Sequence, residues 1–197
     1  MAIEKHPICD TDLWVDLSCI NELEFVFALS FGAYISDAVK YELQNLKERD
    51  ADQFGHAFKN YQVYKDEQKL FRIDLNSNKY FTDDDRKAVK RKFAELRIPY
   101  CFDKGCYTEP KKNMGETVSV VFAGILELPV ILSNDNETPS IIRQHYNWLD
   151  AYNIRKLMET LGKSESEIQN VYGKVKKRKN EFVEENPLLA WKKKYCM

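Results

Sequence analysis

Glycine and proline are scarce in this sequence, with 7 and 6 copies among 197 residues. No Ser- and Gly-rich run and no internal repeat is present, so nothing indicates a flexible linker or a repeat protein. A chain of this length with 44% apolar and 13% aromatic residues can bury one sizeable core, but it is too short for two comfortable domains. We therefore expect one globular domain with elaborations.

Disulfides, zinc knuckles and membrane spans are not indicated either. The cysteines are odd in number and no two are spaced as C-x-x-C; they are Cys9, Cys19, Cys101, Cys106 and Cys196. Free thiols in a reducing cytoplasm are the expected state. The longest apolar stretch, Val118 to Leu132, is interrupted by Glu127 and Pro129, and the start MAIEKHPICD has no basic segment followed by an apolar one. We therefore expect neither secretion nor membrane insertion, and we expect a cytoplasmic location.

The net charge of −1 hides an asymmetry along the chain. Residues 150–197 contain 11 Lys and Arg against 7 Asp and Glu, whereas residues 1–149 contain 19 against 24. A basic tail beside an acidic body fits a polyanion-binding surface next to an acidic metal site, although a solvated helix face gives the same count. The candidate nucleic-acid-binding residues are Lys174, Lys176, Lys177 and Arg178.

Short apolar segments alternate with stretches of helical periodicity. The strand-like segments are His6–Cys9, Ala33–Ile35, Leu70–Leu75 and Val130–Leu132. Helix starts are marked by Ser36, by Thr82 and by the capping box Ser164-x-x-Glu167. Strands alternating with helices predict an α/β fold with a parallel sheet covered on both faces. Residues 99–113 are expected to form a loop, and the last third of the chain to be helical.

Carboxylates follow two of the predicted strands. Asp10 comes directly after the first strand, and Asp135 comes shortly after the last. Because the working site of an open parallel sheet lies at the carboxyl ends of its strands, these two side chains approach each other if their strands are neighbours. Glu42 and Glu116, each early in a predicted helix, could face the same pocket. The structural alternative is that the aspartates cap helices or lie in loops, and that the glutamates are exposed helical residues.

Four carboxylates in one pocket repel one another. Two unit charges about 4 Å apart cost roughly 4 kcal/mol at an effective dielectric constant of about 20. Such a cluster takes up protons or binds a divalent cation. Oxygen ligands without histidine or cysteine select hard ions, so Mg²⁺ or Mn²⁺ is the expected cofactor.

Four sequence motifs resemble, in order, those of the PIN-domain nucleases. They are Ile8-Cys9-Asp10-Thr11-Asp12-Leu13, Ile35-Ser36-x-x-Val39-x-x-Glu42-Leu43, Gly115-Glu116 with the apolar segment 118–126, and Val130-Ile131-Leu132-Ser133-Asn134-Asp135. The resemblance implies a PIN-like three-layer α/β/α domain over residues 1–147, with an insertion at about 47–112. Residues 148–197 would then be a helical C-terminal extension packed on it.

The same resemblance implies a Mg²⁺- or Mn²⁺-dependent endoribonuclease that cuts single-stranded RNA, often the toxin of a toxin–antitoxin pair. The implied catalytic residues are Asp10, Glu42, Glu116 and Asp135. Three of them, Asp10, Glu116 and Asp135, would bind the metal, and Glu42 would orient or activate the attacking water. Thr11 and Ser133 are implied as supporting hydroxyls, and Asp12 as an additional acid. The implied partners are single-stranded RNA, an antitoxin or other protein, and a second copy in a homodimer.

Two other functions remain open on the sequence. Asp10-Thr11-Asp12 after a strand is also the D-x-D of haloacid-dehalogenase-like phosphohydrolases, in which Asp135 would be the metal-binding acid. In that protein class, an aspartyl-phosphate mimic would be trapped at Asp10. The third function is a non-catalytic PIN-like module that binds RNA or a protein, and it predicts RNA binding without metal-dependent cleavage.

Overall fold

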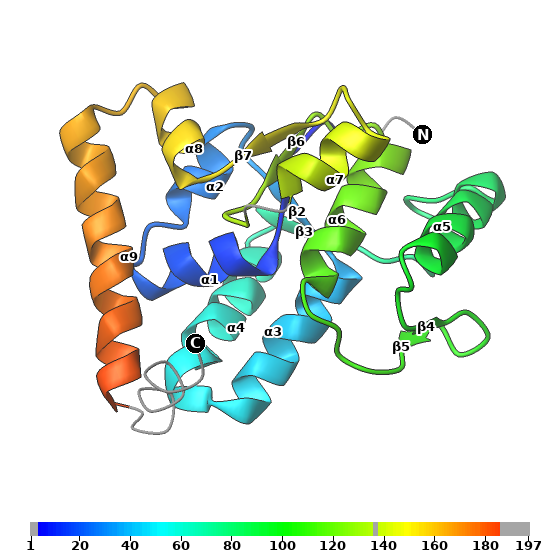
Figure 1. The fold of residues 1–197 in the computed structure, drawn as a ribbon, viewed down its shortest axis with the longest axis horizontal. Helices are drawn as coiled ribbons and strands as arrows, with labels where there is room; N and C mark the ends of the chain where they lie inside the picture. The colour runs from blue at the N-terminus through cyan, green and yellow to red at the C-terminus, as the bar shows by residue number, and fades with distance from the viewer. Residues whose placement is uncertain (1–3, 136–137, 186–197) are drawn as a thin grey trace.

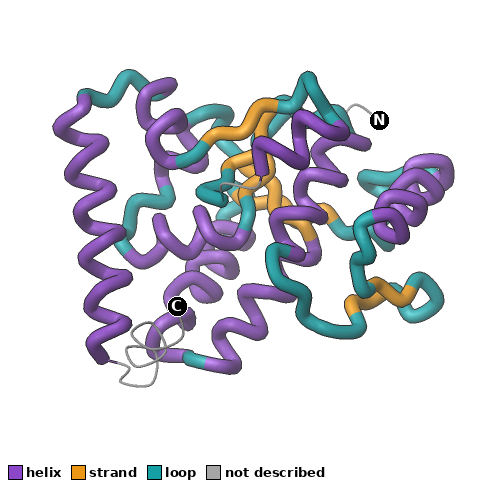
Figure 2. The backbone as a smooth tube through the Cα atoms, viewed as in Figure 1, coloured by secondary structure: helices purple, strands orange, loops and turns teal. Residues whose placement is uncertain are grey.

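The centre of the molecule is a five-stranded sheet in which every neighbouring pair of strands is parallel, in the order β3-β2-β1-β6-β7. A computed structural model describes residues 4–135 and 138–185 (Figure 1). The strands of the sheet are β1 (Ile8–Cys9), β2 (Ala33–Ser36), β3 (Leu70–Ile73), β6 (Val130–Leu132) and β7 (Asp150–Tyr152). Figure 2 shows these strands at the core of a largely helical molecule.

Helices surround the sheet. They are α1 (Thr11–Cys19), α2 (Glu24–Ala28), α3 (Asp37–Arg49), α4 (Ala51–Asp66), α5 (Asp83–Glu95), α6 (Met114–Ile125), α7 (Thr138–His145), α8 (Ile154–Thr160) and α9 (Glu165–Glu185). In the described part of the chain, no helix is long and apolar enough to cross a membrane. The α/β fold and the helical C-terminal region agree with the sequence-based prediction.

Two hydrophobic clusters cover the two faces of the sheet, because successive strand residues point to opposite sides. Cys9 of β1 and Leu132 of β6 pack in one cluster with α1, α2, α4, α8 and α9. Ile8 and Ile131, one position earlier in the same strands, pack in the other with α5, α6 and α7. Helix α3 contributes residues to both clusters. The result is a three-layer arrangement of helices, sheet and helices.

The predicted helix starts are confirmed by their hydrogen bonds. The Ser36 hydroxyl accepts the Val39 N–H at 3.2 Å at the start of α3. Thr82 and Asp85 form a reciprocal capping box before α5. Ser164 and Glu167 form the predicted box before α9, in which the Ser164 N–H donates to Glu167 Oε2 at 2.9 Å. These local signals fix where the helices begin.

The structure differs from the expectations in two places. Residues 99–113 are not a plain loop, because β4 (Tyr100–Cys101) and β5 (Cys106–Tyr107) form an antiparallel hairpin. Gly105, at φ +63°, supplies the backbone conformation that its turn requires. The segment after residue 147 is not helical from its start, because β7 adds a fifth strand to the sheet. Backbone bonds to β6 hold this strand, including Ser133 N–H to Tyr152 O at 2.9 Å.

The segment expected as an insertion, residues 47–112, supplies part of the core. Its helix α4 packs against α1 and α3, and its strand β3 extends the sheet beside β2. Within this segment, α5 and the β4–β5 hairpin lie at one end of the molecule, beyond α6 (Figure 1). The division of the chain near residue 148 stays a prediction.

The direction of the chain across the sheet reverses at β1. The chain runs from β1 outward to β2 and β3, and then returns to β6 on the other side of β1. Ile8 pairs with Ile131 and Cys9 with Leu132, so β1 and β6 are direct neighbours and end at the same level. The carboxyl ends at such a reversal are where open α/β sheets hold their ligands. The residues that follow these two strands therefore come together at this edge.

Candidate functional site

Asp10 lies at the turn between β1 and α1, almost fully buried at 1% exposure. Its carboxylate caps α1 by accepting the Leu13 N–H at 2.9 Å, and the Ser133 side chain also hydrogen-bonds it. The capping interpretation is therefore right for this residue, but it does not exclude a second role. Asp10 also lines the cavity of about 450 Å³ described below.

Glu116 lies in the first turn of α6, where the positive end of the helix dipole favours a carboxylate. Its side chain is 4% exposed, which excludes the interpretation as an exposed helical glutamate. The Thr138 hydroxyl donates a hydrogen bond to Glu116 Oε1. Thr138 Oγ1 also lies 2.8 Å from Ser133 Oγ, so the hydroxyls link Glu116 to the segment after β6.

Glu42, on the second turn of α3, is held between two other helices. Thr11, the first residue of α1, donates its hydroxyl to Glu42 Oε2, and the Gly115 N–H of α6 donates to Oε1 at 2.8 Å. A Cβ atom on Gly115 would lie 2.5 Å from Thr11 Oγ1 and closer still to Glu42 Oε2. Glycine at position 115 is therefore what allows Glu42 to reach the start of α6.

Gly115→Ala is expected to displace the Glu42 carboxylate and to lower the free energy of unfolding by about 1 to 3 kcal/mol, the usual cost of overpacking. The measurement is urea unfolding followed by circular dichroism. Gly173→Ala is the matched control, because a Cβ at that position of α9 meets no atom within 4 Å. In the control, alanine's higher helix propensity should raise stability by up to about 1 kcal/mol. Equal effects at the two positions would contradict the packing described for Glu42.

Asp135 follows β6 at a distance of three residues and is half-buried. Its N–H donates to the Ser133 hydroxyl at 3.1 Å, two residues earlier in the segment after β6. Asp12, on the exposed side of the first turn of α1, lies beside the same opening.

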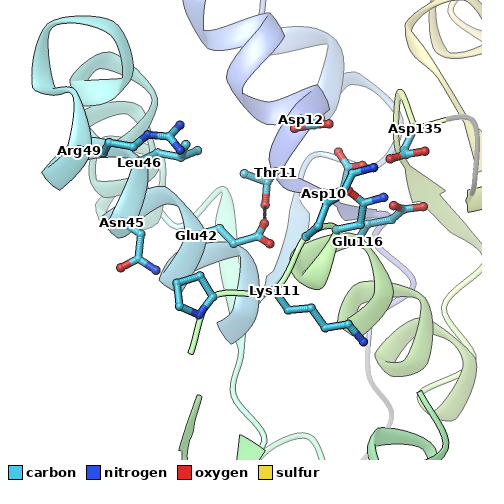
Figure 3. A pocket seen from close by; sticks show the side chains of 13 residues that line it. Asp10, Thr11, Asp12, Glu42, Asn45, Leu46, Arg49, Lys111, Glu116 and Asp135 are labelled. Atoms are coloured by element: carbon cyan, nitrogen blue, oxygen red, sulfur yellow. Dashed lines mark hydrogen bonds between the residues drawn. The ribbon is translucent and has the colours of Figure 1, made fainter. Parts of the chain in front are cut away.

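These residues line one cavity of about 450 Å³ at the carboxyl ends of β1 and β6. The cavity lining includes Asp10, Thr11, Asp12, Glu42, Glu116 and Asp135. Figure 3 shows Asp10, Glu116 and Asp135 grouped on one side of it. Glu42 and Thr11 lie between this group and Asn45 and Arg49 of α3. The fold thus brings all four candidate acids to one place, from four separate segments of the chain.

Burial makes ionisation of Asp10 and Glu42 costly. Desolvation raises the pKa of the Asp10 carboxyl well above its usual value against the hydrogen bonds of Ser133 and Leu13, and the Asp12 and Glu116 carboxylates raise it further. Desolvation also raises the pKa of Glu42, against the hydrogen bonds from Thr11 and Gly115. A carboxyl whose pKa is raised in the folded state stabilises the fold below its unfolded pKa and loses that contribution as the pH rises through the folded value. Near neutral pH the cluster therefore favours a proton or a cation.

The donor set fits a hard divalent cation in kind, because it consists of carboxylate and hydroxyl oxygens. Its present side-chain conformations do not form a finished site. Within residues 4–135 and 138–185, no three Asp, Glu, His or Cys side chains lie in an arrangement that would hold a metal ion. Three of the carboxylates instead hydrogen-bond groups of the protein: Asp10 accepts the Leu13 N–H, Glu42 the Gly115 N–H and Glu116 the Thr138 hydroxyl.

Sequence reasoning missed a polar network behind the cavity. Asp16, 7% exposed, accepts the Asn134 side-chain N–H at 3.0 Å, and Lys179 Nζ lies 2.8 Å from its carboxylate. Asn134 Oδ1 in turn accepts the Ile154 N–H at 3.1 Å. The network therefore ties the segment that carries Asp135 to α1, α8 and α9. The spacing of Asp12 and Asp16, four residues apart on α1, was the only available signal of it.

Lys179→Met is expected to lower the free energy of unfolding by about 1 to 2 kcal/mol, because it leaves the Asp16 carboxylate buried without its cation. The Lys179 side chain is 63% exposed, so solvent screening keeps the effect below that of a fully buried pair. Lys177→Met is the control, since Lys177 Nζ lies 3.7 Å from Glu181 on the helix surface. The control should change stability by less than about 0.5 kcal/mol. Thermal and urea unfolding of both variants measure the difference, and equal losses would contradict this assignment.

The basic residues predicted to bind nucleic acid lie on α9, and none of them lines the main cavity. Lys174 Nζ is 2.8 Å from Glu22, and Arg178 is 3.5 Å from Glu181. Lys176 and Lys177 line a separate shallow hollow on α9. Arg178 and Lys179 line a smaller cavity of about 200 Å³ that borders the main one at Asp12. The basic side chains that do line the main cavity are Arg49, Lys111 and Lys112.

Comparisons with known proteins leave the family open. No protein-family model and no curated protein matches the chain. Among solved structures, it is similar to a crystal structure of VapBC2 from Rickettsia felis bound to a DNA fragment from their promoter. The identity is 17% and the TM-score 0.45, over 74% of this chain and 96% of that one. A likeness at this level assigns neither a family nor an activity.

Proposed function

We propose that this protein is a PIN-like, Mg²⁺- or Mn²⁺-dependent endoribonuclease that cuts single-stranded RNA. One observation carries the proposal: Asp10, Glu42, Glu116 and Asp135 come from four separate segments and line one cavity at the point where the strand order reverses. Burying carboxylates together is unfavourable, and a structural role requires only one of them to cap a helix. A cation site with a neighbouring general base accounts for all four carboxylates.

In this proposal Asp10, Glu116 and Asp135 hold the cation. When bound, a divalent ion supplies a Lewis acid that lowers the pKa of water and neutralises charge on the reacting phosphate. Asp10 accepts the Leu13 N–H and Glu116 accepts the Thr138 hydroxyl, so both carboxylates would have to rotate toward the cavity to hold the cation.

Glu42 orients the attacking water and accepts its proton. The Thr11 hydroxyl and the Gly115 N–H hold this carboxylate beside the other three acids. Burial, which raises its pKa, makes it a better proton acceptor than an exposed glutamate. Thr11 and Gly115 therefore position the base, and the walls of the cavity limit the access of bulk water.

A single strand suits this cavity better than a duplex. Its volume of about 450 Å³ lies within the range of small-ligand pockets, and residues of α1 and α3 line it. An unpaired strand can turn one sugar-phosphate unit into such a hollow, whereas a paired strand is held in a helix. The toxin role, an antitoxin partner and a homodimer are further proposals that rest on the four motifs alone.

The test is cleavage of a pool of single-stranded RNAs of mixed sequence by purified protein in Mn²⁺, in Mg²⁺ and in EDTA. Cleavage that requires the metal is the expected result. Intact RNA in both metals, with protein shown by circular dichroism to be folded, would overturn the enzyme assignment. RNA binding without cleavage would favour the non-catalytic module, and trapping of a beryllium fluoride adduct at Asp10 would favour the phosphohydrolase.

A further inference from the structure

The main cavity has a second end whose chemistry is opposite to that of the acidic group. Asn45 and Arg49 of α3 line this end, and Lys112 from the segment before α6 lines the same cavity. We propose that these three residues bind the phosphate of the nucleotide next to the one that is cut. This subsite rests on the proposed function and names where its RNA substrate is held.

Helix α3 places the two ends along one wall. Glu42, Asn45 and Arg49 are three and seven residues apart, so they lie on one face of the helix. With a rise of 1.5 Å per residue, Glu42 and Arg49 are separated by about 10 Å along the axis. Figure 3 shows Asn45 and Arg49 on the side of the cavity opposite Asp10, Glu116 and Asp135. A phosphate at Arg49 is therefore a different one from the phosphate at the acidic group.

The Asn45 side chain supplies an unused donor. Its Nδ2 atom is buried and has no hydrogen-bond partner among the described residues. A buried donor without a partner costs about 1 to 3 kcal/mol, so buried polar groups of this kind point to a ligand or an ordered solvent molecule. A phosphate oxygen is an acceptor that matches an amide N–H in this position.

Two cations that line the cavity, Arg49 and Lys112, have no carboxylate partner in the described part of the chain. The Arg49 guanidinium lies 5.7 Å from the centre of the Phe54 ring, which leaves its N–H groups available. Lys112 is exposed at the rim. By contrast, Lys111 Nζ donates to the carbonyls of Leu96 at 2.7 Å and Arg97 at 3.1 Å, just after the C-terminus of α5. Lys111 is therefore not part of the subsite.

The separation of charge inside the cavity gives the RNA a defined position. Phosphate is repelled by the acidic end until a cation is bound there, whereas Arg49 at the other end and Lys112 in the cavity lining attract it whether or not the cation is bound. An arginine can also bind a phosphate through two parallel hydrogen bonds, which fixes orientation as well as position. The subsite therefore holds the strand before the cation site is complete.

The experiment measures the binding of a fluorescein-labelled, single-stranded 12-nucleotide RNA with 2′-O-methyl riboses by fluorescence anisotropy in EDTA. Wild type is compared with Asn45→Ala and with Arg49→Ala/Lys112→Ala. The double variant should bind at least about 10-fold more weakly, and its log–log salt slope should fall by about 1.4, or 0.7 for each lost phosphate contact. Arg49→Lys should recover part of the affinity, because it restores the charge without the planar fork.

The matched control is Lys90→Ala/Arg91→Ala, which removes the same charge from exposed positions of α5 that do not line the cavity. The subsite is overturned if the double variant at Arg49 and Lys112 binds like wild type, if the control loses as much affinity, or if wild type binds no RNA. Cleavage in Mn²⁺ is assayed separately. If RNA stays uncut but its binding depends on Arg49, the nuclease proposal is wrong and the subsite is retained. If RNA is cut but the Arg49→Ala/Lys112→Ala variant binds it like wild type, the nuclease proposal is retained and the subsite is wrong.

Discussion

Asp10→Asn is expected to reduce Mn²⁺-dependent cleavage of single-stranded RNA by about 10³-fold, because a bound cation contributes several kcal/mol and each 1.36 kcal/mol is a factor of ten in rate. Asparagine can still accept the Leu13 N–H, so the cap of α1 should persist. Removing one of several neighbouring buried carboxylates should leave the metal-free protein at least as stable as wild type, since burial disfavours the charged form of this side chain.

The control for this variant is Asp50→Asn. Asp50 caps α4 by accepting the Gln53 N–H at 3.0 Å, as Asp10 caps α1, but it does not line the cavity. Cleavage rates of both variants, measured with the same RNA pool, separate capping from chemistry. Equal losses at the two positions, or full activity of Asp10→Asn, would show that this carboxylate does no more than cap its helix.

Glu42→Gln is expected to lower the rate of RNA cleavage by about 10² to 10⁴-fold, the usual contribution of a general base. Glutamine retains an acceptor for the Thr11 hydroxyl or the Gly115 N–H but cannot take up the proton of the attacking water. Metal affinity should change little, because Glu42 is not among the proposed ligands. Single-turnover cleavage and calorimetric Mn²⁺ binding measure the two quantities.

Glu48→Gln on the same helix is the control for that change. Glu48 is exposed and accepts the Gln44 side-chain N–H at 3.0 Å. It should leave both cleavage and metal binding as in wild type. A Glu42→Gln protein that cuts RNA at the normal rate would remove Glu42 from the mechanism. A loss of Mn²⁺ affinity as large as that of Asp10→Asn would make Glu42 a ligand instead.

The convergence of Asp10 and Asp135 was predictable because it depends on local signals. Each follows a short apolar strand, and the carboxyl ends of neighbouring parallel strands lie at one edge. That the two strands pair directly, with Cys9 opposite Leu132, is a property of the sheet order, which the sequence pattern does not specify. The helix starts at Ser36, Thr82 and Ser164 were predictable for the same local reason.

The features that escaped prediction depend on contacts between distant residues. Asp150–Tyr152 has no clear strand pattern, and only the free edge of β6 makes it a strand. Lys179 forms an ion pair with Asp16, which lies 163 residues earlier in the sequence. Asn45 and Arg49 look like ordinary polar residues of a surface helix until the fold places them beside the acidic group. The basic residues of α9 were predicted to bind nucleic acid because they are dense in the sequence. In the structure, Lys174, Lys176, Lys177 and Arg178 do not line the main cavity.

The central claim is that the acidic end of the cavity binds a divalent cation. Calorimetric titration of Mn²⁺ and Mg²⁺ into the purified protein, and into Asp10→Asn and Asp135→Asn, tests it most directly. We predict saturable binding to wild type that is lost or strongly weakened in both variants. Wild-type protein that binds neither ion at millimolar concentration, or binds it equally well without Asp10 and Asp135, would contradict the account.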